Sequence, residues 1–153
     1  SDGNHIIYIS QDSTLKTWNV TNGEKTHTKT DIILGDRIHH EVTFSADGRM
    51  AASFNSSQTA IHLWDLESHQ SSLILAGHTN GVDIVMFSAN GNYVISAGKD
   101  MTLKIWNRST GALMAAFTAE VYVSKLAITT DSTTLIAGDW FGQIHILRLE
   151  EMI

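Results

Sequence analysis

Three residues near the middle of the chain have the types of a hydrolytic triad. His78 could act as a base, Ser96 as a hydroxyl nucleophile, and a nearby acid such as Asp100 as the carboxylate that orients the base. Ser96 lies within an alternating, strand-like run, whereas the serine of a nucleophile elbow sits on a sharp turn between a strand and a helix. No stretch of the chain has the pattern of a helix. The sequence therefore predicts a structural role for these residues, and a protein that is not an enzyme.

The other clusters of titratable residues lack the spacing of a metal or acid–base site. His39 and His40 are adjacent, so on a strand they face opposite sides and cannot bind one metal ion together. The paired carboxylates Glu150 and Glu151 lie in the C-terminal tail. Cysteine is absent, which excludes disulfides, cysteine–zinc sites and a cysteine nucleophile. We therefore expect neither a metal nor any other cofactor.

Tryptophan recurs at a regular step, each time at the end of an alternating run. The three dipeptides are Trp18-Asn19, Trp64-Asp65 and Trp106-Asn107, and the steps between the tryptophans are 46 and 42 residues. A fourth copy has Leu147 in place of tryptophan, 41 residues after Trp106. A period of roughly 40–45 residues with Trp-Asp at a strand end is typical of the blades of a β-propeller.

A turn marker repeats with the same period. It reads Asp2-Gly3, Asp47-Gly48 and Asn90-Gly91, and the fourth copy, Asp131-Ser132, has lost its glycine. Asp-Gly and Asn-Gly adopt positive φ easily, which suits tight hairpins between short strands. Two markers that share one period indicate the same repeat.

The predicted units have up to four strands each, ordered outwards from the propeller axis. The strands are expected at 5–10, 14–20 and 25–30; 38–44, 50–55, 60–66 and 72–75; 82–87, 93–97, 102–107 and 113–117; and 123–128, 134–138 and 143–149. The first unit (about 1–35) lacks the innermost strand and the last (119–153) lacks the outermost, whereas the units at 36–76 and 77–118 are complete. We therefore predict one all-β segment over 1–153, a partial propeller of about three and a half four-stranded antiparallel blades. Such an arc belongs to a longer propeller or closes with a second copy.

These repeats resemble the WD-repeat family along essentially the whole chain. The best copy contains Gly77-His78, Ser96, Asp100 and Trp106. The resemblance implies a structural hydrogen-bond network that joins His78, Ser96, Asp100 and Trp106. The other repeats depart from the pattern, because Tyr8, Gln58 and Phe141 replace its polar residues. We expect one complete network, with the remaining blades relying more on apolar packing.

The C-terminal stretch around Gly138-Asp139 and 142–150 also resembles the last propeller blade of signalling NTPases of the NACHT or apoptosome-adaptor type. The resemblance implies that the chain is the sensing part of a larger ATPase. The nucleotide site would lie elsewhere, because the chain has no Gly-x-x-x-x-Gly-Lys-Ser/Thr sequence.

Composition restricts the partners and the compartment. The formal net charge is −6, the isoelectric point is near 5.7, and no run of basic residues occurs, so nucleic-acid binding is not expected. No apolar stretch is long enough to span a bilayer, and the N-terminus shows no cleavable signal pattern. We therefore expect a cytoplasmic, intracellular protein that binds neither nucleic acid nor membrane.

Binding is the function that remains, and loops on a rigid scaffold are its usual place. We expect protein partners on the rim formed by the loops between blades and the loops between the second and third strands. Trp140-Phe141 is the main candidate, because neighbouring aromatic residues on a loop are typical interface anchors. The full candidate set is Arg37, His39, Asn80, Asp83, Lys99, Met101, Tyr122, Asp139, Trp140 and Phe141. The rival hypothesis is a self-associating half-propeller that closes as a homodimer and has a purely structural role.

Overall fold

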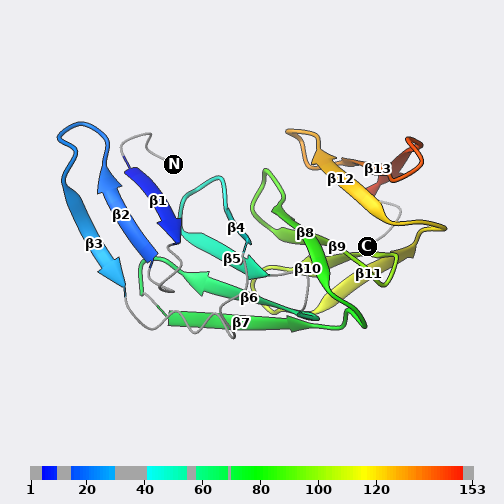
Figure 1. The fold of residues 1–153 in the computed structure, drawn as a ribbon, viewed down its shortest axis with the longest axis horizontal. Coiled ribbons are helices and arrows are strands. Elements are labelled where there is room, and N and C mark those ends of the chain that lie inside the picture. The colour runs from blue at the N-terminus through cyan, green and yellow to red at the C-terminus, as the bar shows by residue number, and fades with distance from the viewer. Residues whose placement is uncertain (1–4, 10–14, 30–40, 55–57, 69, 150–153) are drawn as a thin grey trace.

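Four antiparallel sheets stand side by side along an arc (Figure 1). The computed structural model describes residues 5–9, 15–29, 41–54, 58–68 and 70–149. These residues form fourteen strands and no α-helix, which confirms the all-β prediction for the described part of the chain.

Strand order within each sheet follows chain order, so every connection between paired strands is a hairpin. The sheets are β1–β3, β4–β7, β8–β11 and β12–β14. Their strands are β1 (His5–Ile9), β2 (Leu15–Asn19), β3 (Lys25–Lys29), β4 (Glu41–Phe44), β5 (Met50–Phe54), β6 (Ala60–Asp65), β7 (Gln70–Ala76), β8 (Val82–Phe87), β9 (Tyr93–Gly98), β10 (Thr102–Asn107), β11 (Leu113–Thr118), β12 (Val123–Ile128), β13 (Thr134–Asp139) and β14 (Ile144–Arg148).

The strand bounds follow the predicted ones closely. β8, β10 and β12 have the predicted limits, and most other ends differ by at most one residue. β7 is longer than predicted, because Gln70 pairs with Asp65 and Ala76 pairs with Ala60 at the two ends of the ladder. The predicted start at 38 of the first strand of the second unit lies outside the described residues.

The turn between the first two strands of a sheet is built by the repeated marker. Gly48 and Gly91 have φ of 69° and 72°, the left-handed region that glycine adopts without steric cost. Ser132 takes the same conformation in the last sheet with φ of 60°. Its hydroxyl is buried and accepts a hydrogen bond from the Asn90 amide at 3.0 Å. The lost glycine is thus replaced by a residue that links two neighbouring sheets.

The core lies between neighbouring sheets. One cluster joins the second and third sheets, from Phe54, Ile61 and Leu63 to Val82 and Trp106. A second cluster joins the third and fourth sheets through Ile95, Leu103, Ile105, Leu135 and Leu149. Because side chains alternate between the two faces of a strand, a sheet covered on both sides needs apolar residues at successive positions. β9 and β10 are buried along most of their length for this reason.

Candidate functional site

The structure brings His78, Ser96, Asp100 and Trp106 together in the third sheet. The Ser96 hydroxyl lies 2.8 Å from His78 Nε2 and accepts the Trp106 indole N–H at 2.9 Å. On the other side of the imidazole, Nδ1 lies 2.9 Å from the Asp100 carboxylate. With Nδ1 protonated, the imidazole donates to Asp100 and accepts from Ser96, so every polar group of the set has a partner.

Asp100 also links the loop before β8 to the start of β10. Its carboxylate accepts hydrogen bonds from the Thr79 amide at 2.8 Å, the Thr102 amide at 3.0 Å and the Thr102 hydroxyl at 2.7 Å. Burial raises the pKa of Asp100, but the hydrogen bonds from Thr102, Thr79 and His78 outweigh it and hold that pKa at about 2. Burial lowers the pKa of His78, against the opposing effect of Asp100. The pair at neutral pH is therefore a neutral imidazole beside an ionised carboxylate.

This arrangement does not offer a nucleophile to a substrate. Ser96 is fully buried, and its hydroxyl is engaged with both His78 and Trp106. The three residue types of a triad are thus used as a buried polar network that fixes the third sheet. Among the described residues, no group of three or more His, Cys, Asp or Glu side chains could hold a metal ion.

The network is shorter in the first two sheets. The Trp64 indole N–H donates to Ser53 at 2.9 Å, so the second sheet keeps the tryptophan–serine half of the arrangement. In the first sheet, Trp18 Nε1 is buried and has no hydrogen-bond partner among the described residues. Tyr8 stands in the sequence where the second and third repeats have Ser53 and Ser96.

The last sheet has a different carboxylate–histidine pair, which the sequence did not reveal. Asp139 accepts from the amides of Phe141 and Gln143, each at 2.9 Å, and lies 3.0 Å from His145 Nε2. The hydrogen bond from His145 is the main cause that lowers the pKa of Asp139. Asp139 was expected to be exposed on the rim, and this is wrong: it is buried because its oxygens hold the β13–β14 turn from inside. In the sequence, this pair is visible as an Asp and a His that lie six residues apart, on the two sides of the turn between the last two predicted strands.

The turn held by Asp139 presents two aromatic side chains to solvent. Trp140 is 76% exposed and Phe141 is 74% exposed. Gly142, with φ of 82°, completes the turn, and its amide donates to the Asp139 carbonyl at 3.1 Å. The Trp140 amide donates to the Tyr122 carbonyl at 3.0 Å, which ties the turn to the loop before β12.

A largely apolar hollow of about 590 Å³ opens beside this turn. We call it the aromatic hollow, and it is lined by Met101, Glu120, Val121, Tyr122, Trp140 and Phe141. These residues come from three connections: β9–β10, β11–β12 and β13–β14. Three rim loops that are separate in sequence therefore share one surface.

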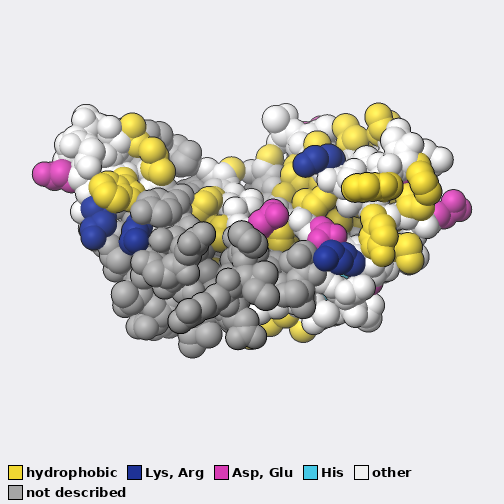
Figure 2. Space-filling view, viewed as in Figure 1, with side chains coloured by type: hydrophobic (Ala, Val, Ile, Leu, Met, Phe, Trp, Pro, Cys, Tyr) yellow, Lys and Arg dark blue, Asp and Glu magenta, His cyan; other side chains and the backbone are white. Residues whose placement is uncertain are grey.

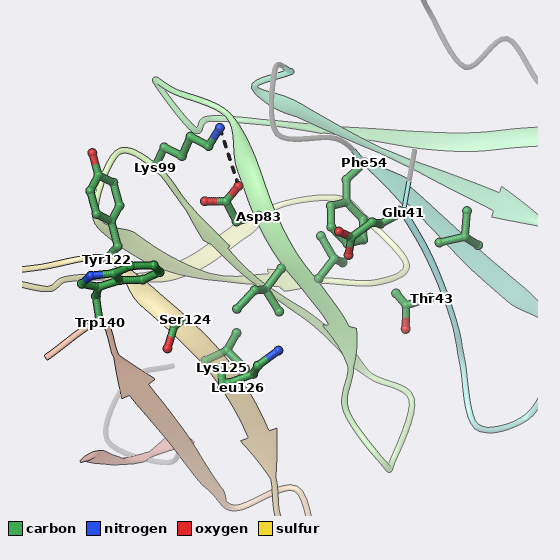
Figure 3. Close-up of a pocket in the computed structure, with 13 residues that line it drawn as sticks. Glu41, Thr43, Phe54, Asp83, Lys99, Tyr122, Ser124, Lys125, Leu126 and Trp140 are labelled. Carbon is green, nitrogen blue, oxygen red and sulfur yellow. Dashed lines mark ion pairs between the residues drawn. The ribbon is translucent and has the colours of Figure 1, made fainter. Parts of the chain in front are cut away.

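A second hollow of about 670 Å³ lies along the inner strands β4, β8 and β12 (Figure 3). Tyr122 and Trp140 lie close together at one end of it, and Asp83 and Lys99 form an ion pair of 4.0 Å near them. Glu41, Thr43, Ser124 and Lys125 add polar groups to its wall. Polar side chains of these strands therefore face the hollow together with apolar ones such as Ile84 and Leu126.

The comparisons with known proteins agree with this geometry. Residues 78–149 match the family model of the TEP-1 C-terminal beta-propeller. A WD repeat-containing protein of Dictyostelium discoideum is 33% identical over 120 residues, covering 74% of this chain and 19% of the relative. The chain belongs to the WD-repeat β-propeller family. The COMPASS component SWD3 of Saccharomyces cerevisiae is 28% identical, covering 98% of the chain and 47% of the relative. Autophagy-related protein 16 of Arabidopsis thaliana is 24% identical, and the match covers 96% of the chain and 29% of the relative.

This WD-repeat chain spans less than half of the length of each of these relatives. The prediction of a partial WD-repeat propeller is confirmed by the fold and by these matches together. No helix in the described part of the chain is long and apolar enough to cross a membrane.

Five of the predicted rim residues gather in one region of the WD-repeat arc: Asp83, Lys99, Tyr122, Trp140 and Phe141. Met101 joins them in the aromatic hollow. Asn80 is exposed on the loop before β8, where its side chain accepts the Gly81 amide at 2.8 Å. Arg37 and His39 lie outside the described residues. Figure 2 shows hydrophobic side chains gathered over the C-terminal sheets on the face in view.

Proposed function

We propose that this chain is a non-catalytic scaffold that binds protein partners through the rim around Trp140. The observation that carries the proposal is the pair Trp140 and Phe141, 76% and 74% exposed on a turn fixed by the buried Asp139. Large aromatic side chains at a rigid, solvent-exposed position are the residue type that dominates interface energies. Two relatives carry names of complex members, a COMPASS component and a target of rapamycin complex subunit, which supports a role in assemblies.

Capture of partners by matched variants tests this function. The tagged protein is expressed in cells, and the proteins that co-purify with Trp140→Ala are compared with those that co-purify with Ile74→Ala. Ile74 is 57% exposed on β7 and lies outside both hollows, so its variant controls for loss of any exposed apolar side chain. We expect Ile74→Ala to retain the partners and Trp140→Ala to lose them, with both melting temperatures unchanged. Equal capture by both variants would contradict the proposal.

The chain is proposed to be part of a larger propeller, because the last sheet has an uncovered apolar face. Ile136, Ile144 and Ile146 are 38%, 70% and 68% exposed. Their equivalents one repeat earlier, listed in the same order, are Ile95, Leu103 and Ile105, which are fully buried by the following sheet. A further WD-type sheet would cover the isoleucines in the same way.

A more specific form of this proposal is that the chain is the sensor region of a signalling NTPase. It is supported by the tail resemblance and by the match to a model of a C-terminal propeller. The proposed compartment is the cytoplasm, which fits a chain without cysteine. A full-length reading frame that contains a P-loop, together with cytoplasmic fluorescence of the tagged protein, would support both. A reading frame without a nucleotide-binding motif would contradict the NTPase assignment.

The alternative function is a half-propeller that closes as a homodimer. It is favoured by the other end of the arc, where Ile6 is 56% exposed and pairs with Trp18 across β1 and β2, on one face. In the third sheet, the equivalent face of Trp106 packs on the preceding sheet. The first sheet of one copy could therefore cover the last sheet of another. Light scattering separates the two functions: a stable dimer supports closure by two copies, and a monomer contradicts it.

A further inference from the structure

The aromatic hollow has an unusual combination of surfaces. Tyr122 is 47% exposed and Trp140 and Phe141 far more, so three aromatic rings border one space. Met101, 39% exposed, adds a polarisable side chain. Glu120, also exposed, is the one charged residue of the lining.

We propose that the aromatic hollow receives the cationic side chain of a lysine or arginine from an extended segment of a protein partner. The inference rests on the proposed function and names the chemistry of the partner at the same site. The faces of aromatic rings carry negative electrostatic potential and attract a cation within about 6 Å of the ring centre. Glu120 would supply the opposite charge at the edge of the same space.

The surrounding charges favour a cation over an anion. Lys99 lines the neighbouring inner hollow, where its ammonium lies 4.0 Å from the Asp83 carboxylate. Lys125 lines that inner hollow as well, but no lysine or arginine lines the aromatic hollow, where Glu120 is the one charged residue. The whole chain has a formal net charge of −6, which adds a long-range attraction for basic segments.

The same residues disfavour the other side-chain classes. A carboxylate would be repelled by Glu120 and by the ring faces. A purely apolar side chain would fill the hollow but would remove water from Glu120 without offering it a partner, which costs free energy. An extended segment fits better than a folded surface, because the lining comes from three loops around a depression.

Two peptides of matched shape test the proposal. The probes are acetyl-Gly-Gly-Arg-Gly-Gly-amide and the same peptide with citrulline, which keeps the shape of arginine but has no charge. Binding to the full chain is followed by the NMR shift of the Trp140 indole N–H, identified by its loss in Trp140→Phe. We expect the arginine peptide to bind about three-fold more tightly than the citrulline peptide, the size of an exposed cation–π contact.

Two variants and a control complete the test. Glu120→Gln should lower affinity for the arginine peptide about two-fold and leave the citrulline peptide unchanged. Trp140→Ala should weaken the arginine peptide by about ten-fold. Glu67→Gln, at an exposed carboxylate in the β6–β7 turn and away from both hollows, should change neither.

The outcomes separate this proposal from the proposed function. Equal binding of both peptides, or the absence of any shift of the Trp140 indole, would overturn the cation site. If Trp140→Ala still loses its cellular partners in that case, the scaffold function stands without it. Loss of neither partners nor peptide binding in Trp140→Ala would overturn both.

Discussion

Ser96 shows how one hydroxyl can satisfy two buried rings. It accepts from the Trp106 indole and donates to His78, and the Asp100 carboxylate orients the imidazole from the other side. Removing one member leaves the others buried and unpaired, which costs more than the net energy of the hydrogen bond itself. The residue types that suggest catalysis are used here for stability.

Replacement of Asp100 by alanine tests that use. Asp100→Ala leaves the His78 Nδ1 proton and the Thr79 and Thr102 amides without their acceptor, so we expect a loss of about 1–3 kcal/mol in the free energy of unfolding. Urea unfolding followed by tryptophan fluorescence measures it. Asp131→Ala is the control, because that carboxylate is exposed and, within the described part of the chain, accepts hydrogen bonds from Thr129 and Thr133 of its own turn. An unchanged midpoint in Asp100→Ala would sink the structural role of the network.

Acid unfolding provides a second test at the same residue. The pKa of Asp100 is about 2 in the folded chain against an ordinary value of 3.8. A carboxyl with a lowered folded pKa contributes stability above its unfolded pKa, and this is lost as pH falls through the folded value. We therefore expect about 2 kcal/mol of stability to be lost between pH 3.8 and about 2, and this step to shrink in Asp100→Asn. Denaturant midpoints across that range measure it; identical slopes in both proteins would argue against the shift.

The turns decide what each sheet can present. In the last sheet, Asp139 replaces the missing tight-turn aspartate by accepting from amides two and four residues ahead. Phe141 therefore occupies the position that Asp100 has in the third sheet, and the turn can carry exposed aromatic residues. In the Asp131-Ser132 turn, serine adopts the positive φ less easily than glycine would, but its hydroxyl accepts a hydrogen bond from Asn90 in the neighbouring sheet.

Ser132 provides the prediction at this scale. Ser132→Ala keeps the left-handed residue and loses the bond to Asn90, so the free energy of unfolding should fall by about 1 kcal/mol or more. Ser132→Gly loses the same bond but relieves the positive φ, so it should lose less stability. Chemical denaturation of the two variants and the parent checks this order. Parent-like stability of Ser132→Ala would mean that the inter-sheet bond contributes nothing.

The whole molecule is an arc in which the third sheet packs against a neighbour on both faces, whereas the last sheet has an exposed apolar face. The isoleucines of β14 are exposed, whereas their equivalents in β10 are buried. An exposed apolar sheet face of this kind is a place for association. The proposals of a larger propeller and of a homodimer both start from this face.

Ile146→Glu tests association at that face. If two copies close the arc, the charge would have to be buried against the partner sheet, and the dimer should dissociate. Ile74→Glu is the control, because Ile74 is also exposed but lies on β7 of an internal sheet. Light scattering over a range of concentrations measures both. A dimer that persists in Ile146→Glu would show that another surface holds the copies together.

The period of tryptophans and turn markers was enough to predict the class of fold, and nearly all strand limits to within one residue. Local patterns suffice there, because alternation and turn residues act over a few neighbours in sequence. The members of the third-sheet network could also be named, since the resemblance to WD repeats marks their positions.

The tertiary structure alone decided which side chains are exposed and which share a surface. Asp139 and Trp140 are neighbours in sequence, yet one is buried and the other is 76% exposed. Glu120, Met101 and Phe141 line one hollow although they come from three different connections. Their proximity depends on how neighbouring sheets pack, and that depends on contacts between residues some forty positions apart. A local sequence pattern carries no information about such contacts, so the chemistry of the rim became visible only in three dimensions.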